Sequence, residues 1–522
     1  MTTAAAGPTA YPATLRGVVD RDWRARFRLT VLVYCGLCTA IISSLGVLLI
    51  PTIAHAQHVS LSSAQWVLTV NLLVGAISTP VVGRLADGPR PRRVLIGMLI
   101  GVLAGSVLCA VPGSFPQLLV GRALQGLTYG IIPVTITLAR RHLPAEQVRR
   151  GVGALSVTAA TGIGLGYPFT GLIAEHLSYR VAFWVAALFS GSALTLAPLV
   201  IPGTAPAESV RRRRDLTGWL LRSAAFGSGA VVPGGLVAVP ESPAPGPAGA
   251  ARFDVVGTFL LALGLGAALL GLSETSDWGW VSAPVLGLLL GAAVVLTAWA
   301  RWELHTPAPL VRLSLLRHPD VAVANLAALG LGTSMYIGFA AVGQLGQTPR
   351  STGYGLGLSV FVAGCVIMPL SIGSQLASRV AAALAGRVGP RSLLPIGALF
   401  VVAANAELAL RHGSLVELLV AMMLFGFGIG TTFAAMPGMI LGAVPAAEVG
   451  SATSFNQVLR TIGGSIGSAI TGAVLAMHTS GGLPVDSGYR NTFALSSAIS
   501  GLLLLALLIE RLRGRRENGR TG

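Results

Sequence analysis

Gly83-Arg84-Leu85-Ala86-Asp87-Gly88-Pro89-Arg90-Pro91-Arg92-Arg93 forms a short basic loop between two long apolar segments, near 64–86 and 93–112. A weaker copy follows an apolar segment at the corresponding place in the second half of the chain, Leu384-Ala385-Gly386-Arg387-Val388-Gly389-Pro390-Arg391. A feature that recurs at matching positions in two halves is typical of a membrane protein built from an internal repeat. The two copies therefore predict a duplicated architecture.

The composition indicates that lipid surrounds most of the chain. Hydrophobic residues make up 53% of the 522 residues and charged residues only 11%, against about 25% in an average soluble domain. A transmembrane helix needs about 20 mostly apolar residues. We therefore expect an all-α polytopic membrane protein with fourteen spans, near 29–53, 64–86, 93–112, 117–139, 151–176, 180–202, 254–273, 282–301, 320–345, 355–379, 392–411, 413–441, 450–477 and 492–511.

The arginines predict the orientation of these spans. The formal net charge is +17, and all 36 basic residues are arginine. They lie between apolar segments, which does not fit a nucleic-acid-binding surface. If the N-terminus is cytoplasmic, two arginines fall inside spans, and only Arg180, Arg350, Arg411 and Arg490 fall in external loops. The positive-inside rule therefore favours two cytoplasmic termini and an even number of spans.

The spans divide into six, two and six. The expected parts are an N-terminal tail (1–28), a six-helix half (29–202), a flexible cytoplasmic loop (203–252), an extra helix pair (253–301), a second six-helix half (302–511) and a C-terminal tail (512–522). The tail 1–28 is polar, and the apolar segment after it is too long for a signal peptide. The Arg211–Arg214 cluster in the long loop either anchors the topology or contacts anionic lipid headgroups.

The four cysteines do not indicate a metal or redox site. Cys35 and Cys38 have the spacing of a Cys-x-x-Cys motif, but they stand in an apolar span with no histidine or acid nearby. Cys109 and Cys365 also lie in apolar segments. We expect these cysteines to be packing residues, with no metal and no cofactor.

Three spans carry further motifs. The fourth contains Arg122-Ala123-Leu124-Gln125-Gly126-Leu127-Thr128-Tyr129-Gly130, and the fifth contains Gly162-Ile163-Gly164-Leu165-Gly166-Tyr167-Pro168-Phe169-Thr170-Gly171. The thirteenth contains Asn456-Gln457-Val458-Leu459-Arg460-Thr461-Ile462-Gly463-Gly464. With the loop at 83–93, these motifs resemble the major facilitator superfamily, in particular its fourteen-span branch of drug/proton antiporters. The resemblance covers residues 29–511 and is weakest in the loop 203–252.

The resemblance implies a gating role for the first loop. A carboxylate at Asp87 can pair with arginines and with the positive end of a helix in the other half. Pro91 stands where the family usually has a basic residue, and the alternative is a basic loop that only sets topology. The candidate gating residues are Gly83, Asp87, Arg90, Arg92 and Arg93.

Arg122 is costly inside a span and should face the protein interior, paired or hydrated. Gln125 is three residues away and shares its helix face. The resemblance implies a role in proton coupling for Arg122, Gln125 and Gly126; the alternative is an arginine that extends to the membrane surface.

The fifth span resembles the antiporter signature, which is associated with export. A nucleotide-binding loop is excluded there because no strand precedes the glycines. Glycines permit close contact with the facing half, and a proline permits a bend. The candidates are Gly162, Gly166, Pro168 and Gly171, and Tyr167 stands where the family usually has glycine.

Polar and aromatic residues within spans are the candidates for a substrate pocket. Asn456 and Arg460 are four residues apart and share a helix face, and Arg460 is suited either to an anionic substrate group or to a protein carboxylate. The full set is Trp66, Asn71, Tyr129, Asn325, Tyr336, Asn405, Asn456 and Arg460.

One feature departs from the antiporter branch. The branch usually carries an acid in the first span, about nine residues before a proline, and Ile42 stands at that distance from Pro51. Glu407 and Glu417 fall near the external surface. Because arginine does not titrate, no proton carrier is evident from the sequence.

We expect a secondary active transporter in a bacterial cytoplasmic membrane that exports small amphipathic or lipophilic compounds by alternating access. Its expected partners are membrane lipids, a small-molecule substrate and protons, with no nucleic acid, and a monomer is expected. Uptake of a small nutrient by the same fold is the alternative. A membrane-embedded enzyme is disfavoured because the spans hold no histidine cluster, paired carboxylates or Ser/His/Asp set.

Overall fold

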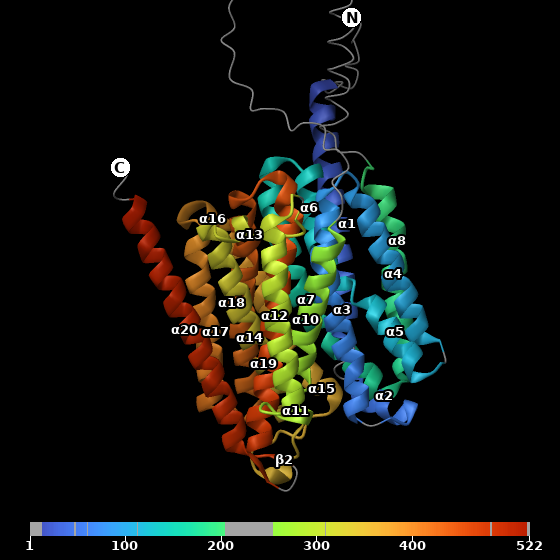
Figure 1. Cartoon of the computed structure of the whole chain (residues 1–522), viewed down its shortest axis with the longest axis vertical. Helices are drawn as coiled ribbons and strands as arrows, with labels where there is room; N and C mark the ends of the chain where they lie inside the picture. Colours follow the sequence, from blue (N-terminus) through green and yellow to red (C-terminus); the bar gives the residue numbers. More distant parts are fainter. Residues whose placement is uncertain are drawn as a thin grey trace, which may run out of the picture.

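A computed structural model describes residues 13–45, 49–59, 61–111, 113–203, 254–307, 309–480 and 483–518. The described chain is a bundle of long helices (Figure 1). Helices are expected here because lipid offers no hydrogen bonds to the backbone, and a helix satisfies its own. The expected loop 203–252 and its Arg211–Arg214 cluster lie outside the described residues, apart from Gly203.

The first half holds eight helices, some of which combine into one span. They are α1 (Ala13–Ser44), α2 (Ile50–Gln57), α3 (Leu61–Asp87), α4 (Pro91–Ala110), α5 (Phe115–Gln125), α6 (Thr128–His142), α7 (Ala145–His176) and α8 (Tyr179–Val200). The extra pair is α10 (Val255–Ser273) and α12 (Ala283–His305), joined by the short α11 (Thr275–Trp278) and followed by α13 (Leu313–Leu316).

The second half runs from α14 to α20. Its helices are α14 (Pro319–Gln347), α15 (Val360–Cys365), α16 (Met368–Val388), α17 (Leu393–Leu410), α18 (Leu415–Ala443), α19 (Val449–Met477) and α20 (Asp486–Asn518). Short 3-10 helices are η1 (Arg350–Thr352), η2 (Pro390–Ser392) and η3 (Ala446–Glu448). A two-stranded antiparallel sheet, β1 (Thr479–Ser480) and β2 (Leu483–Pro484), joins α19 to α20, and Thr479 pairs with Pro484.

Thirteen segments of the described chain are long and apolar enough to cross a membrane. The helix α7, with 32 residues, has the length but carries more glycine and threonine, and it packs against α1, α16 and α18 inside the bundle. With α7 the described chain has fourteen helical segments of membrane-spanning length, in agreement with the sequence prediction.

Several predicted boundaries are wrong. The first helix begins at Ala13 and ends at Ser44, so part of the expected tail 1–28 is helical, and Figure 1 shows α1 projecting beyond the bundle. The tenth span extends to Val388 rather than 379, and the last helix continues to Asn518 into the expected tail 512–522. Composition locates the apolar part of a helix. The helix itself can continue beyond the lipid, because its backbone hydrogen bonds form in water as well.

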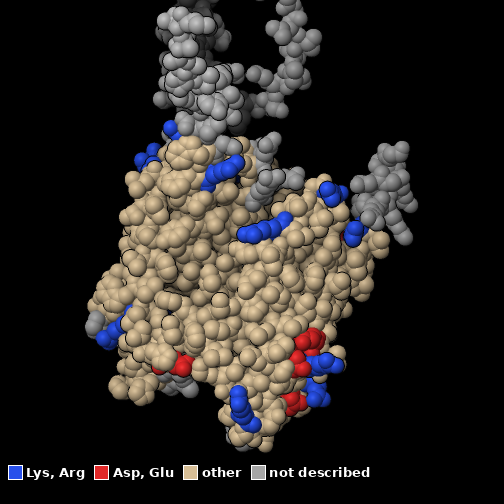
Figure 2. Space-filling model, turned by 180° about the vertical axis from the view of Figure 1, so that it is seen from behind, with Lys and Arg blue, Asp and Glu red and all other residues tan. Residues whose placement is uncertain are grey.

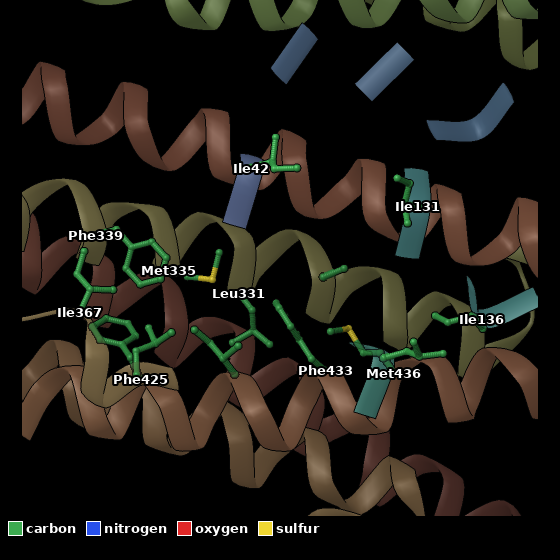
Figure 3. Packing of buried hydrophobic residues seen from close by; sticks show 14 of the residues in the cluster. Ile42, Ile131, Ile136, Leu331, Met335, Phe339, Ile367, Phe425, Phe433 and Met436 are labelled. Atoms are coloured by element: carbon green, nitrogen blue, oxygen red, sulfur yellow. The ribbon is translucent and has the colours of Figure 1, made fainter. Parts of the chain in front are cut away.

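The core joins the two halves. Figure 3 shows Ile42, Ile131 and Ile136 of the first half beside Phe339, Phe433 and other side chains of the second, and all belong to one buried cluster. Large apolar side chains also cover the outside of the bundle, such as Leu188, Leu290 and Leu410, which are 69%, 67% and 82% exposed. Such an apolar exterior fits contact with lipid.

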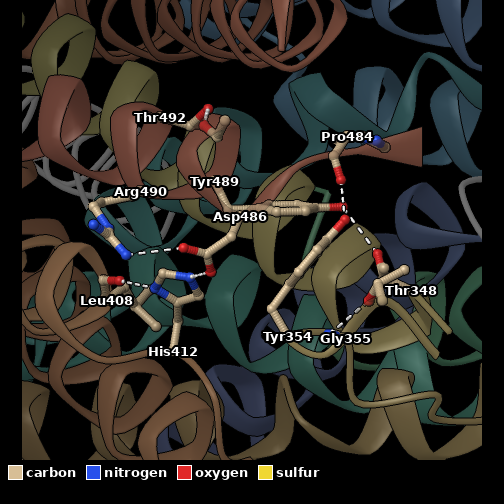
Figure 4. Close-up of polar contacts among 12 residues, drawn as sticks. Thr348, Tyr354, Gly355, Leu408, His412, Pro484, Asp486, Tyr489, Arg490 and Thr492 are labelled. Atoms are coloured by element: carbon tan, nitrogen blue, oxygen red, sulfur yellow. Dashed lines mark hydrogen bonds and ion pairs between the residues drawn. The ribbon is translucent and has the colours of Figure 1, made fainter. Parts of the chain in front are cut away.

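The two ends of the molecule differ in charge. Figure 2 shows arginines at the end where α1 projects, and acidic side chains together with further arginines at the opposite end. At that opposite end, His412 Nε2 lies 2.9 Å from Asp486 Oδ1, and Arg490 donates to Asp486 Oδ2 at 2.9 Å. Figure 4 shows these contacts together with the bond between the hydroxyls of Thr348 and Tyr489, 3.0 Å apart. They tie α14, α17 and α20 into one block.

Candidate functional site

A cavity of about 510 Å³ lies between the two halves. Its walls come from α1, α2, α3, α5, α6 and α7 of the first half and from α14, α15, α18 and α19 of the second. It extends from Gln457, in the first third of α19, to Gln347 and Val360, where α14 ends and α15 begins. Those two residues stand at the end of the bundle opposite Asp87, so the cavity opens toward one side only.

Aromatic side chains form much of the cavity wall. Tyr129, Tyr167, Tyr336, Phe339 and Phe433 all line it. Two glycines allow the rings to lie against neighbouring backbone: a Cβ at Gly75 would collide with the ring of Tyr129, and one at Gly464 with the ring of Tyr336. The tyrosines thus depend on close helix approach for their positions.

Arg122 is fully buried beside the cavity. Its Nε donates to the Val67 carbonyl oxygen at 3.0 Å, and its Nη1 donates to Gln125 Oε1 at 2.7 Å. Gln125 in turn donates to Ser106 Oγ at 2.9 Å. The remaining nitrogen, Nη2, has no hydrogen-bond partner among the described residues. The helix break between α5 and α6, at Gly126 and Leu127, follows directly.

Arg460 lines the cavity from the second half. Its guanidinium lies over the ring of Phe433, 4.3 Å from the centroid, an attractive cation–π geometry. Tyr336 is close enough to Arg460 to interact with it electrostatically, and Tyr129 is similarly close to Arg122 and to Tyr336. Each of the two arginines therefore has a tyrosine nearby on the cavity wall.

The predicted pocket residues separate into two groups. Asn71, Tyr129, Tyr336 and Arg460 line the cavity. The others do not, because helix contacts take up their side chains: Asn456 Nδ2 donates to Asn325 Oδ1 at 3.0 Å, and Asn405 Nδ2 donates to the Val401 carbonyl oxygen of its own helix. Trp66 is half-buried on α3, outside the lining. Trp66, Asn325, Asn405 and Asn456 thus lie outside the described lining of this cavity, although Asn456 borders a second, much smaller void beside it.

Sequence reasoning also missed several lining residues. On α19 the cavity face is a stripe of polar or small residues at helical spacing, Gln457, Arg460, Thr461, Gly464, Ser465 and Ser468. This spacing of three, four and seven residues is readable in the sequence. We expected Asn456 to share the cavity-facing side of α19 with Arg460, but the residue that lines the cavity is its neighbour Gln457. On α14, Gln344 and Gln347 were missed in the same way.

The Asp87 carboxylate joins the two halves at the arginine-rich end. Asp87 accepts hydrogen bonds from the backbone N–H groups of Gly450 at 2.6 Å and Ser451 at 2.8 Å. These are the second and third residues of α19, whose first-turn N–H groups have no partner within the helix. A first-half carboxylate therefore caps a second-half helix, with support from the helix dipole. We call this contact the Asp87 cap.

Two glycines and one acid make further contacts between the two halves beside the Asp87 cap. Gly83 and Gly450 approach so closely that a Cβ on either would meet the carbonyl oxygen of the other. Glu448, just before α19, lies 3.5 Å from Arg84 Nη1 and 3.3 Å from Arg312 Nε. Arg84 belongs to the first half, so its ion pair with Glu448 is a second polar contact between the two halves at this end.

The predicted loop arginines do not pair with the Asp87 side chain. Arg92 Nη2 donates instead to the Pro198 carbonyl oxygen of α8 at 2.6 Å. Arg141, at the end of α6, donates to the backbone carbonyl oxygens of Asp87 and Gly88. Arg90 and Arg93 flank the start of α4, where the Arg93 N–H donates to the Arg90 carbonyl oxygen at 3.0 Å. The Asp87 carboxylate uses backbone amides because α19 begins there.

The glycines of α7 serve two different neighbours. A Cβ at Gly171 would meet the Val360 carbonyl oxygen and Phe361 of the facing half, and Pro168 lies against Gly364. Gly162 and Gly166 instead pack against Ala40 and Ser44 of α1, in their own half. The expected close approach to the facing half therefore occurs at Gly171 and at Gly164, where a Cβ would collide with Ser371 of α16, but not at Gly162 or Gly166.

Comparison with known proteins agrees with this geometry. The family model described as Major Facilitator Superfamily matches residues 32–468 and 326–522. An uncharacterized MFS-type transporter of Mycobacterium tuberculosis is 28% identical over 496 residues, which cover 92% of this chain and 65% of the relative. The chain thus spans slightly less than two thirds of that relative's length.

Two further relatives have functional names. Multidrug resistance protein Stp of M. tuberculosis is 26% identical over 82% of this chain and 71% of its own length. The tetracenomycin C resistance and export protein of Streptomyces glaucescens is 24% identical over 88% of this chain and 77% of its own length.

A solved structure shows the same fold. The crystal structure of the human organic anion transporter MFSD10 covers 92% of this chain and 99% of its own, with a TM-score of 0.60 and 15% sequence identity. At that identity the likeness concerns the fold alone. Two six-helix halves, a central cavity and a family model that matches nearly the whole chain lead to one assignment: this chain belongs to the major facilitator superfamily.

Proposed function

We propose that the protein is a secondary active exporter of small amphipathic compounds that works by alternating access. The observation that carries the proposal is the cavity of about 510 Å³ between the halves, with the Asp87 cap at one end and an opening at the other. Its volume is within the usual range of about 300–1,000 Å³ for small-molecule sites. The names of the two resistance relatives support export rather than uptake.

We place the protein in the bacterial cytoplasmic membrane with both termini inside. The arginines around the ends of α3 and α6 and the start of α4, at the end where α1 emerges, support this orientation: Arg84, Arg92, Arg93, Arg140 and Arg141. In it, the Asp87 cap faces the cytoplasm and the cavity opens outward, so the structure represents the outward-facing stage of the cycle. We propose that lipid surrounds a monomer and that the proton-motive force drives the cycle.

Transport by inside-out vesicles tests the proposal. Vesicles that contain the protein should accumulate an amphipathic dye when respiration energises the membrane, and an uncoupler should release the dye. Vesicles with Gly83→Leu are the control, because a side chain at this position collides with Gly450 and Ser454 across the seam and should block the outward-facing stage. Accumulation in right-side-out vesicles only would indicate uptake, and no gradient-dependent movement of any compound would overturn the proposal.

A further inference from the structure

We propose that the cavity binds an amphipathic organic anion, an aromatic carboxylate or sulfonate, whose acid group is held by Arg122 and Arg460. This inference rests on the proposed function and names the substrate class of the same cavity.

The charge of the described cavity lining is the first support. The lining contains Arg122 and Arg460 and no aspartate, glutamate or histidine. A guanidinium stays protonated in proteins, so the cavity carries two positive charges without a protein counter-charge. Elsewhere in the described chain several arginines pair with acids, as in Arg84 with Glu448 and Arg391 with Asp320. A buried charge needs a partner, and in the cavity the ligand is the group left to supply it.

Unused donors beside the cavity are a second, independent support. Arg122 is fully buried, and its Nη2 has no hydrogen-bond partner among the described residues. Asn71 is 2% exposed and lines the same cavity, and neither atom of its amide has a partner there. Buried polar groups are almost always satisfied. An oxyanion that reaches Arg122 would accept from Nη2, and the Asn71 amide could donate to the same group or to its neighbour.

The cavity wall defines the rest of the ligand. Tyr129, Tyr167, Tyr336, Phe339 and Phe433 present ring surfaces and three hydroxyl groups. Rings stack on aromatic ligands and on planar cations, whereas a small hydrated anion such as phosphate would leave these surfaces uncovered. A ring system with one acid group matches both the charge and the wall.

A matched pair of dyes tests the charge requirement. Fluorescein and rhodamine 123 share a xanthene ring system, but fluorescein is an anion and rhodamine 123 a cation. Binding of each to the full-length protein in lipid nanodiscs is measured by fluorescence polarisation. We expect fluorescein to bind at least tenfold more tightly than rhodamine 123. Equal binding of the two dyes, binding of neither, or preference for rhodamine 123 would each overturn the anion assignment.

Variants of the two arginines locate the anion. Arg460→Gln and Arg122→Gln should each weaken fluorescein binding about tenfold or more, as expected for loss of a charged hydrogen bond, while rhodamine 123 binding stays the same or rises. Arg460→Lys keeps the charge and should retain part of the affinity. Arg301→Gln is the control, because Arg301 is exposed on α12 outside the cavity. If Arg301→Gln weakens fluorescein as much as Arg460→Gln does, the cavity is not the site.

The ratio of the two dye affinities keeps the test independent of folding. A variant that is only destabilised loses both dyes together, whereas loss of an anion site changes their ratio. Arg460→Glu should reverse the preference toward rhodamine 123, and an unchanged ratio in this variant would contradict the proposal. The substrate class and the export function can also fail separately: vesicles that accumulate rhodamine 123 but not fluorescein would keep the exporter and overturn the anion.

Discussion

At the residue scale, Asp87 holds the two halves together at the arginine-rich end. Its carboxylate accepts from two backbone amides of the opposite half, and both bonds must break before the halves can separate at that end. An N-terminal cap contributes about 0.5–2 kcal/mol. That energy is enough to bias two conformations several-fold while leaving the cap reversible at each cycle.

Asp87→Asn should weaken this bias. The amide keeps one acceptor oxygen but loses the charge that interacts with the dipole of α19, so the inward-facing population should rise several-fold. Ser454→Cys supplies the measurement, because Ser454 is fully buried behind the seam and a membrane-impermeant maleimide should label it faster from the arginine-rich side. Asp254→Asn is the control, since Asp254 caps Gly257 of its own helix and should leave labelling unchanged. Equal labelling with and without Asp87→Asn would remove the gating role.

At the element scale, α19 carries two functions on two faces. Gln457, Arg460 and Gly464 face the cavity, while Gly463 and Gly467 lie against the backbone of α14, where a Cβ would meet the carbonyl oxygens of Leu329 and Thr333. The second face explains why α14 and α19 pack so closely: lipid gives helices little reason to associate, so backbone contact must provide it.

Gly467→Ala should therefore destabilise the protein. The added methyl group meets the Thr333 backbone, which cannot rotate away, and overpacking of this kind costs about 1–3 kcal/mol. The melting temperature of detergent-solubilised protein should fall measurably. Gly438→Ala is the matched control, because Gly438 lies inside α18 with open space around its Cα, and its melting temperature should stay the same or rise. A fall of equal size in both variants would show that close packing is not the cause.

How far the sequence predicted each element depended on the kind of information required. The fourteen spans and the Asp87 contact with a helix of the opposite half were predictable, because apolar length and a charged loop are local signals. The start of α1 at Ala13 was not, because helix can continue beyond lipid. For the cavity, Arg460 was named as a candidate from its motif in the thirteenth span. Asn456 was chosen in place of Gln457, because a single residue of helix rotation depends on packing against α14, which no single sequence displays.

At the scale of the whole molecule, the charge of the proposed substrate allows the electrical part of the proton-motive force to drive export. An interior-negative potential acts on a charge that crosses the membrane with about 2.3 kcal/mol per charge per 100 mV. An anion that leaves the cell moves downhill in this field. Because the described cavity lining contains no titratable acid or histidine, the potential is available as a driving force that requires no proton in the cavity.

Fluorescein efflux from proteoliposomes should therefore respond to the potential alone. With valinomycin and a potassium gradient that makes the interior negative, at equal pH on both sides, efflux should accelerate, and reversal of the gradient should slow it. Proteoliposomes with Arg460→Gln are the control and should show little response. Efflux that follows a pH gradient and ignores the potential would contradict this prediction.

The extra helix pair has a consequence for the membrane plane. The helix α10 packs on α3 of the first half and on α19 of the second, and Thr69 of α3 shares a hydrogen bond of 3.0 Å with Ser273 of α10. The helix α10 thus covers one of the two joints between the halves. The other joint, between α7 and α16, is not packed extensively against α10 or α12 in the described chain. A lipophilic molecule in the bilayer therefore meets α10 at one of the two joints between the halves and only α7 and α16 at the other. Direct entry from the lipid is thus more obstructed on the α10 side of the protein than on the α7–α16 side.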